Sequence, residues 1–213
     1  MTQQPSADDP NSEAFRADLE TADQPFDASS LERPAVQRRL MNKAVHYLGR
    51  YSASQQRLRE VLGRFALRKL GHFEPSDIQD AISIVVADCV RLGYVDDTAF
   101  AMSQARSKRR SGKSALAIRR GLQQHAIDEE LVAEALGRAD EDLHDGELGA
   151  ALRHAERRRL GPFHRGEMDD AKRQRHLASL ARAGFALGIA RQVMELADRE
   201  AAEELVYQLR DLS

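Results

Sequence analysis

The stretch GYVDDTAFA, Gly93 to Ala101, decides how the chain folds. Gly93 closes an apolar helical pattern, because glycine adopts the left-handed conformation at little cost after a last turn. Asp96 or Asp97 then caps a new helix, since a carboxylate accepts hydrogen bonds from the free N–H groups of a first turn. Phe100 packs inward from that turn. We therefore assign Gly93, Tyr94, Asp96, Asp97 and Phe100 to the structure rather than to binding.

Upstream of this stretch, apolar residues recur at spacings of three and four, which predicts three helices. The first runs from about Val36 to Tyr51, and Ser52 or Ser54 caps the second. Gly71 ends the second helix in the left-handed conformation, and the third opens near Pro75. Cys89, the only cysteine, falls on the apolar face of the third helix and is expected to be buried.

Downstream the same pattern begins again, and then once more. Ser111-Gly112 breaks the fourth helix, Ser114 caps a short fifth and Asp128 a sixth. A further round of apolar faces follows between residues 148 and 196. Gly71, Ala126 and Gly184 occupy the same turn in the three rounds, 55 and 58 residues apart. This period predicts an all-α protein of three tandem three-helix units resembling helix-turn-helix motifs.

The charge divides the chain into an acidic start and a basic remainder. Residues 1–32 carry a net charge of −7, against +5 for the rest. They also lack a sustained apolar period, so we expect a disordered acidic tail there. The repeats are then predicted at residues 33–94, 95–142 and 143–213, the last with a C-terminal extension.

Several classes of protein are disfavoured by the sequence. One cysteine fits a reducing cytosol, and the polar N-terminus with no long apolar run argues against export or membrane insertion. Gly112-Lys113-Ser114 resembles the end of a phosphate-binding loop, but Ser107 stands where that loop needs glycine and follows a helix instead of a strand. The seven histidines are scattered without a metal-binding pattern. We expect no catalytic residues, no metal and no cofactor.

One segment carries positive charge without any local acid. From Thr98 to Ile127 there are seven bases: Arg106, Lys108, Arg109, Arg110, Lys113, Arg119 and Arg120. Either acids from elsewhere in the fold neutralise them or they bind an anionic partner, and we expect the second. The start of the helix after Ser114 adds backbone N–H groups to this charge, which makes a natural anion cradle. Charge alone does not choose between DNA and an acidic protein groove.

The string GYVDDTAFA closely resembles the signature of the RecX family, which regulates the RecA recombinase. Ser54 with Leu58 and Leu62 is similar to the family's serine-capped helix, and Gly184-Phe185 to its last turn. The resemblance spans about residues 36–196. Ala126 departs from it, because the family usually has glycine there, so strain of up to about 1 kcal/mol or a different cap is expected. The last helix also begins at Ala186-Leu187-Gly188 without a polar cap.

The resemblance implies an elongated array of repeats that binds along the groove of the RecA–DNA filament, without being an enzyme. Such a protein modulates, and most often inhibits, RecA's ATPase and strand exchange in recombination and DNA repair. We accordingly expect a cytoplasmic monomer whose seven central bases contact the filament or DNA, single- or double-stranded, without regard to sequence. A stand-alone DNA-binding module of helix-turn-helix type is the alternative.

Overall fold

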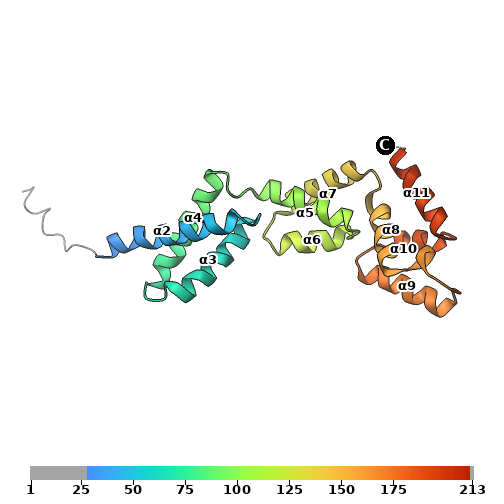
Figure 1. Cartoon of the computed structure of the whole chain (residues 1–213), viewed down its shortest axis with the longest axis horizontal. Helices are drawn as coiled ribbons and strands as arrows, with labels where there is room; N and C mark the ends of the chain where they lie inside the picture. Colours follow the sequence, from blue (N-terminus) through green and yellow to red (C-terminus); the bar gives the residue numbers. More distant parts are fainter. Residues whose placement is uncertain (1–27, 212–213) are drawn as a thin grey trace, which may run out of the picture.

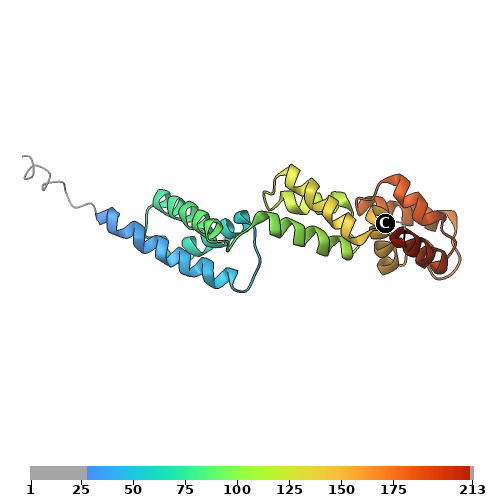
Figure 2. The same cartoon turned by 90° about the horizontal axis from the view of Figure 1, so that it is seen from above.

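The computed structural model describes residues 28–211, in which helices joined by turns and loops are present and no strand occurs. Three bundles of helices follow one another along the long axis of an elongated molecule in both views (Figures 1 and 2). The described part therefore has the predicted all-α architecture of three tandem three-helix units. The predicted tail falls largely on residues 1–27, which lie outside the described residues.

The first bundle contains α2 (Ala28–Leu48), α3 (Gln55–Lys69) and α4 (Pro75–Arg91). Ser54 caps α3, where its hydroxyl accepts a hydrogen bond from the N–H of Arg57 at 3.2 Å. The core joins the apolar faces of all three helices, with Leu40, Leu58 and Val86 fully buried. Cys89 lies in the same core, as predicted, and burial raises the pKa of its thiol.

Helix α2 begins earlier than the sequence suggests. It starts at Ala28 and includes Pro34, whereas the tail was expected to extend to residue 32. Residues 28–32 are therefore helical, which corrects that boundary. Val36, Leu40 and Ala44 bury one face of α2 against the rest of the bundle, and this packing stabilises the helix.

The second bundle contains α5 (Asp97–Arg110), α6 (Ala115–Gln123) and α7 (Glu129–Leu143). Asp96 caps α5 by accepting the N–H of Ala99 at 3.0 Å, and Ser114 caps α6 by accepting that of Ala117 at 3.2 Å. Asp128 precedes α7 but makes no side-chain cap. Phe100 is buried in the core of this bundle, as the signature predicts.

The third bundle contains α8 (Gly146–Arg158), the short 3₁₀ helix η2 (Gly161–Phe163), α9 (Asp170–Arg182) and α10 (Leu187–Glu195). A further helix, α11 (Arg199–Asp211), packs against α8 and η2 and adds Ala202 to the core. Arg199 lies 5.1 Å from the centre of the Phe163 ring and pairs with Glu156 at 2.5 Å. The C-terminal extension is thus part of this bundle.

The turn before the last helix of each bundle is not identical in the three units. Ala126 has φ of 54° and Gly184 φ of 92°, so both are left-handed. The strain predicted at Ala126 is therefore present, because an L-residue with a side chain adopts this conformation at a cost. In the first bundle, by contrast, Leu70, which follows α3, has φ of −126°, and Gly71 is not left-handed, which corrects that expectation. Ala186 stands at the N-cap of α10 and provides no side-chain cap, as expected.

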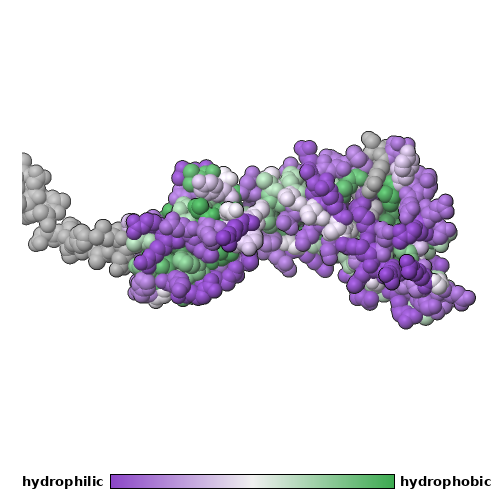
Figure 3. Space-filling view, in the orientation of Figure 1, coloured by the Kyte–Doolittle hydropathy of each residue, from purple (hydrophilic) through white to green (hydrophobic). Residues whose placement is uncertain are grey.

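Three separate clusters of buried apolar side chains lie in the three bundles. We propose that they are the cores of the domains predicted at 33–94, 95–142 and 143–213. One contact crosses the first boundary, because Val95 packs into the first cluster. On the surface, hydrophilic residues dominate, and green hydrophobic patches interrupt them mainly over α2–α4 and beside α11 (Figure 3).

Candidate functional site

The seven bases of the central segment differ in whether the fold gives them an acidic partner. Acids from outside the segment neutralise three of them. Arg106 pairs with Asp142 at 2.5 Å, Arg119 pairs with Glu129 at 2.7 Å, and Arg109 has two acidic partners. Within residues 28–211 the other four bases have no carboxylate at ion-pair distance: Lys108, Arg110, Lys113 and Arg120.

Arg109 is a buried structural residue, which corrects its assignment to filament or DNA contact. Its side chain is 2% exposed and donates two hydrogen bonds to Asp140, at 2.6 and 2.9 Å, and another to Glu147. Burial alone would lower the pKa of Arg109, but the two carboxylates outweigh it and raise the pKa above its ordinary value. Arg109 therefore joins α5 to α7 and α8 and is closed to a partner.

The anion cradle expected at the start of α6 is already occupied by the chain itself. The carboxylate of Glu147 accepts the N–H of Ala115 at 3.0 Å, and the hydroxyl of Ser114 accepts that of Ala117. A negative side chain at a helix N-terminus is favourable because the peptide dipoles leave positive charge there. The start of α6 therefore holds Glu147 instead of an external phosphate.

The two bases of α5 without acidic partners, Lys108 and Arg110, line different hollows. Lys108 lines a pocket between α5 and α6, together with Lys113. Arg110 lines a separate hollow with Arg106, on the surface of α5 formed by Ala99 and Ser103. The run of charge in the sequence is thus not one continuous patch, because α-helical geometry sends successive residues in different directions.

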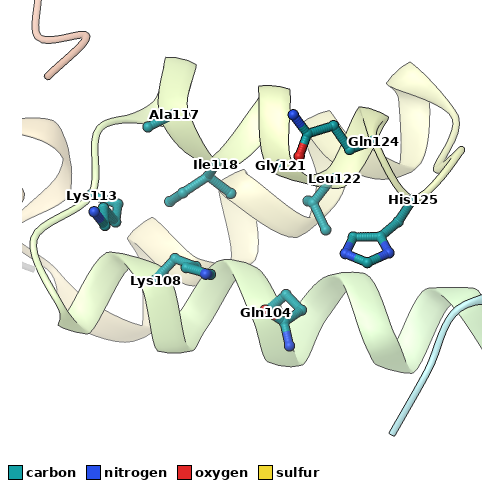
Figure 4. A pocket seen from close by; sticks show the side chains of 9 residues that line it. All are labelled: Gln104, Lys108, Lys113, Ala117, Ile118, Gly121, Leu122, Gln124 and His125. Carbon is teal, nitrogen blue, oxygen red and sulfur yellow. The ribbon is translucent and has the colours of Figure 1, made fainter. Parts of the chain in front are cut away.

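The pocket between α5 and α6 has a volume of about 310 Å³. Lys113 lies at one end and His125 at the other, with Lys108 and Gln104 on the α5 side (Figure 4). Ile118 and Leu122 point from α6 toward α5 and form an apolar floor (Figure 4). The pocket therefore combines two ammonium groups with amides and an apolar base.

The positive charge near Lys113 continues into the third bundle. His154 of α8 is 9% exposed, and burial lowers its pKa. Arg157, Arg158 and Lys113 lower that pKa further, so these three charges lie near one imidazole. Arg157 and Arg158 are exposed and have no ion-pair partner in the part of the chain that the structure describes. In the sequence their charge is diluted by neighbouring acids such as Glu156, which is why the central segment is favoured there.

The junctions between bundles use the same contacts twice. At the first junction Asp97 accepts the N–H of Gln55, the first residue of α3, at 2.9 Å, and Ser54 contacts Nδ1 of His125 at 3.4 Å. At the second junction Glu147 accepts the N–H of Ala115, the first residue of α6. The cap residue Ser114 also contacts the following bundle there, because its hydroxyl donates to the carbonyl of Ala183 at 2.7 Å. The second helix of the first bundle and that of the second bundle are thus each capped by an acid of the following bundle. Sequence analysis missed this role for Glu147.

Close packing also fixes the second junction. A Cβ on Gly112, whose φ is 67°, would lie 2.8 Å from the backbone nitrogen of His154 and 2.9 Å from the carbonyl oxygen of Ala150. Arg153 reaches across to the carbonyl of Arg109 at 3.3 Å while it pairs with Asp145 at 2.5 Å. These contacts hold Lys113 beside α8 and so set the spacing of the positive charges.

No helix among residues 28–211 is long and apolar enough to cross a membrane. Nor do the described residues bring three or more histidine, cysteine or acidic side chains together around a possible metal.

Comparison with known sequences gives consistent matches. The model of a family domain described as RecX, second three-helix domain, matches residues 96–136. Regulatory protein RecX of Myxococcus xanthus is 38% identical over 160 residues, covering 73% of this chain and 84% of the relative. Regulatory protein RecX of Agrobacterium fabrum is 29% identical over 164 residues, covering 77% of this chain and 86% of that one.

Solved structures give the same fold. A crystal structure of RecX from Lactobacillus salivarius superposes with a TM-score of 0.58 at 20% identity, over 77% of this chain and 97% of the other. A second crystal structure, of regulatory protein RecX, gives a TM-score of 0.61 at 17% identity, over 78% of this chain and 74% of the other. At these identities the likeness establishes the fold alone.

Proposed function

This chain belongs to the RecX family of regulatory proteins, and from that premise we propose that it binds the RecA–DNA nucleoprotein filament and lowers the ATPase and strand-exchange activity of RecA. The family resemblance and the names of the relatives support the recombinase as partner. We further propose that it acts as a monomer in the cytoplasm, in recombination and DNA repair, by occupying a surface without catalysing a reaction.

The observation that carries the proposal is the set of four exposed bases on the second bundle without acidic partners in the described chain: Lys108, Arg110, Lys113 and Arg120. Leaving four cations unneutralised has no structural benefit, while three of their neighbours are paired. Unneutralised cations attract phosphates, and each phosphate contact releases a counterion. We assign these four bases to filament or DNA contact, with Arg106 and Arg119 at the margin because each already has an acidic partner.

The junctions explain how such a surface would act on a helical assembly. Because Asp97 and Glu147 tie the bundles together, the positive charges keep fixed spacings along the molecule. Such a row of bundles should bind more tightly to a filament conformation whose phosphates have the same spacing as these positive charges than to a conformation whose phosphates are spaced differently. A ligand shifts a conformational equilibrium only by its difference in affinity between the states. The protein would thus favour a less active state of the filament.

The experiment measures ATP hydrolysis and strand exchange by the cognate RecA with increasing amounts of this protein. The test variant carries Lys108→Gln, Arg110→Gln, Lys113→Gln and Arg120→Gln. A matched control removes the same charge from exposed bases of the first bundle: Arg38, Arg39, Arg68 and Lys69. We expect the native protein and the control to inhibit and the test variant to lose most of the inhibition.

Two results would count against the proposal. If the native protein at saturation leaves both activities unchanged, it is not a modulator of that recombinase. If the test variant and the control inhibit equally, the four bases do not carry the interaction. Equal affinity for bare duplex DNA and for the filament would instead favour a stand-alone DNA-binding module.

A further inference from the structure

The first bundle carries a second run of positive charge, with as many bases as the central segment. Residues 33–59 contain no acid and seven bases: Arg33, Arg38, Arg39, Lys43, Arg50, Arg57 and Arg59. Most of them lie on α2 or directly after it, and α2, drawn in blue, runs along one edge of the first bundle (Figure 2). None of these bases is among those assigned to the filament, so their charge needs a separate explanation.

One face of α2 combines these bases with aromatic rings. Four residues follow one another along it at intervals of four: Arg39, Lys43, Tyr47 and Tyr51. Residues three or four apart are neighbours on a helix surface, with Cβ atoms about 5–6 Å apart. The turn after α2 continues this line, because the N–H of Tyr51 donates to the carbonyl of Tyr47 at 3.1 Å. Arg50, three residues beyond Tyr47, lies beside the end of the line.

The three bases of this face have no acidic partner. Arg39 and Arg50 are exposed and Lys43 is half-buried. None of the three lies at ion-pair distance from a carboxylate in the part of the chain that the structure describes. In the same bundle Arg57 does have a partner, Glu60 at 2.8 Å. Three neighbouring cations without counter-charge favour an anionic ligand.

The two tyrosines form an aromatic platform at the end of this face. Tyr47 packs against the core of the first bundle, and the centre of the Tyr51 ring lies 5.2 Å from that of Tyr47. The Tyr51 ring is tilted by 36° to it and is 58% exposed. Because Tyr47 is anchored in the core, Tyr51 has a fixed support and presents a free aromatic surface.

The exposed ring distinguishes among anionic ligands. An acidic peptide would use only the bases. Duplex DNA offers phosphates, but its bases are stacked on one another, and unstacking one of them costs free energy. A single strand offers both a chain of phosphates and free base faces, each of which can stack on an aromatic side chain. From Arg39 to Arg50 the face is about 16 Å long, which leaves room for more than one phosphate.

We propose that this face of α2 binds single-stranded nucleic acid, with Arg39, Lys43 and Arg50 on its phosphates and one base stacked on Tyr51. The contact is indifferent to sequence, because every base has a face that can stack. The site lies on the first bundle and uses neither the recombinase nor the four central bases, so it does not rest on the proposed function.

The test measures the affinity of the full-length protein, without recombinase, for three fluorescein-labelled strands of equal length. They are an oligothymidine, an oligouridine and an abasic sugar-phosphate strand of the same charge, and binding is followed by anisotropy. We expect one or both of the strands with bases to bind about fivefold or more tightly than the abasic strand, the lower limit for one stacked base. The tighter of the two identifies DNA or RNA as the ligand.

A pair of tyrosine variants makes this result specific. Tyr51→Ala should remove the advantage of the strands with bases over the abasic strand. Tyr207→Ala, which removes another exposed tyrosine from α11, should leave that advantage unchanged. Both side chains lie mostly in solvent, so both variants should fold.

The bases are tested by the salt dependence of binding to the same strands. Neutralising Arg39, Lys43 and Arg50 to Gln should make the slope of log affinity against log salt less negative by about 2, since each phosphate contact on a single strand contributes about 0.7. A matched control neutralises three exposed bases of α3 and should leave the slope unchanged: Arg64, Arg68 and Lys69.

Three results would overturn the proposal. The first is equal affinity of the native protein for all three strands, and the second is an equal advantage of the strands with bases in the two tyrosine variants. The third is binding of a duplex or of polyglutamate that is as tight as that of the single strand and independent of Tyr51, because this face would then serve an acidic partner through charge alone. No recombinase is present, so none of these results bears on the modulation of RecA.

Discussion

Asp97 lies across the junction between the first two bundles and accepts two hydrogen bonds from Gln55, from its backbone N–H at 2.9 Å and from its side-chain amide at 3.2 Å. Asp96, its neighbour, caps α5, whose first residue is Asp97. The two aspartates of the signature therefore have different structural roles. One begins a helix and the other connects two repeats.

Removing the second aspartate should loosen that connection. Asp97→Ala leaves the N–H of Gln55 without its charged acceptor, and hydrogen bonds to charged groups contribute about 1.5–3 kcal/mol. We expect a loss of stability at the low end of that range and faster hydrogen exchange at the Gln55 amide. Asp88→Ala, which removes an exposed pair with Arg91, is the control and should cost less than about 1 kcal/mol. Unchanged exchange at Gln55 would show that the contact does not tie the bundles.

Substitution of two neighbouring arginines on α5 should change the stability of the protein by very different amounts. Arg109→Gln leaves Asp140 and Glu147 without their buried counter-charge and should lower the free energy of unfolding by about 3–5 kcal/mol. Arg110→Gln removes an exposed base and should change it by less than about 0.5 kcal/mol. Urea denaturation measures both. Similar losses for the two variants would contradict the structural role assigned to Arg109.

The strained turn at Ala126 offers a stabilising substitution. Ala126 has φ of 54°, a conformation that glycine adopts without strain. Ala126→Gly should therefore stabilise the protein by up to about 1 kcal/mol. As a control, Ala133→Gly in the middle of α7 should destabilise it by about 1 kcal/mol, because glycine is unfavourable inside a helix. If both substitutions destabilise equally, the turn is not strained.

Histidine 154 should make stability depend on pH. Its pKa is lowered in the folded protein, first by burial and then by Arg157, Arg158 and Lys113. In the unfolded chain it takes up a proton near its ordinary pKa of about 6.5. The unfolded state thus binds more protons just below that pH, and stability falls as the pH is lowered through it.

The comparison that isolates this effect uses His154→Leu. Denaturation at several pH values between 7.5 and 5 should show a smaller fall in stability for the variant than for the native protein. The pKa of His176 is also lowered, by burial first, but it is present in both proteins and cancels in the difference. Parallel curves for the two proteins would show that His154 does not contribute.

Local signals in the sequence were enough to predict most of the helices and the three-unit all-α architecture, although not helix α11. Ser54, Asp96 and Ser114 are caps in the structure as their residue types indicate, since capping depends on neighbours within one turn. The buried faces followed from spacings of three and four in the same way. The family was identified from the signature and confirmed by the match to a relative that is 38% identical.

The site was predicted less well because it depends on contacts between distant residues. Arg109 and Arg110 are adjacent in the sequence, yet one is buried between Asp140 and Glu147 and the other is exposed. Only the fold brings those acids to α5. The cap that Glu147 supplies to Ala115 spans 32 residues and has no local signal. A run of charge therefore predicted the region but not which of its members are accessible.

The most direct test of the central claim is the affinity for the RecA nucleoprotein filament, for RecA alone and for bare duplex DNA, measured at matched salt for the native protein and for the variant neutralised at Lys108, Arg110, Lys113 and Arg120. We predict tightest binding to the filament, weakened markedly in the variant, with a logarithmic salt dependence of about −4 for four phosphate contacts that falls toward zero when the bases are removed. Binding to bare DNA as tight as to the filament, or a filament affinity that is the same in both proteins, would contradict the account.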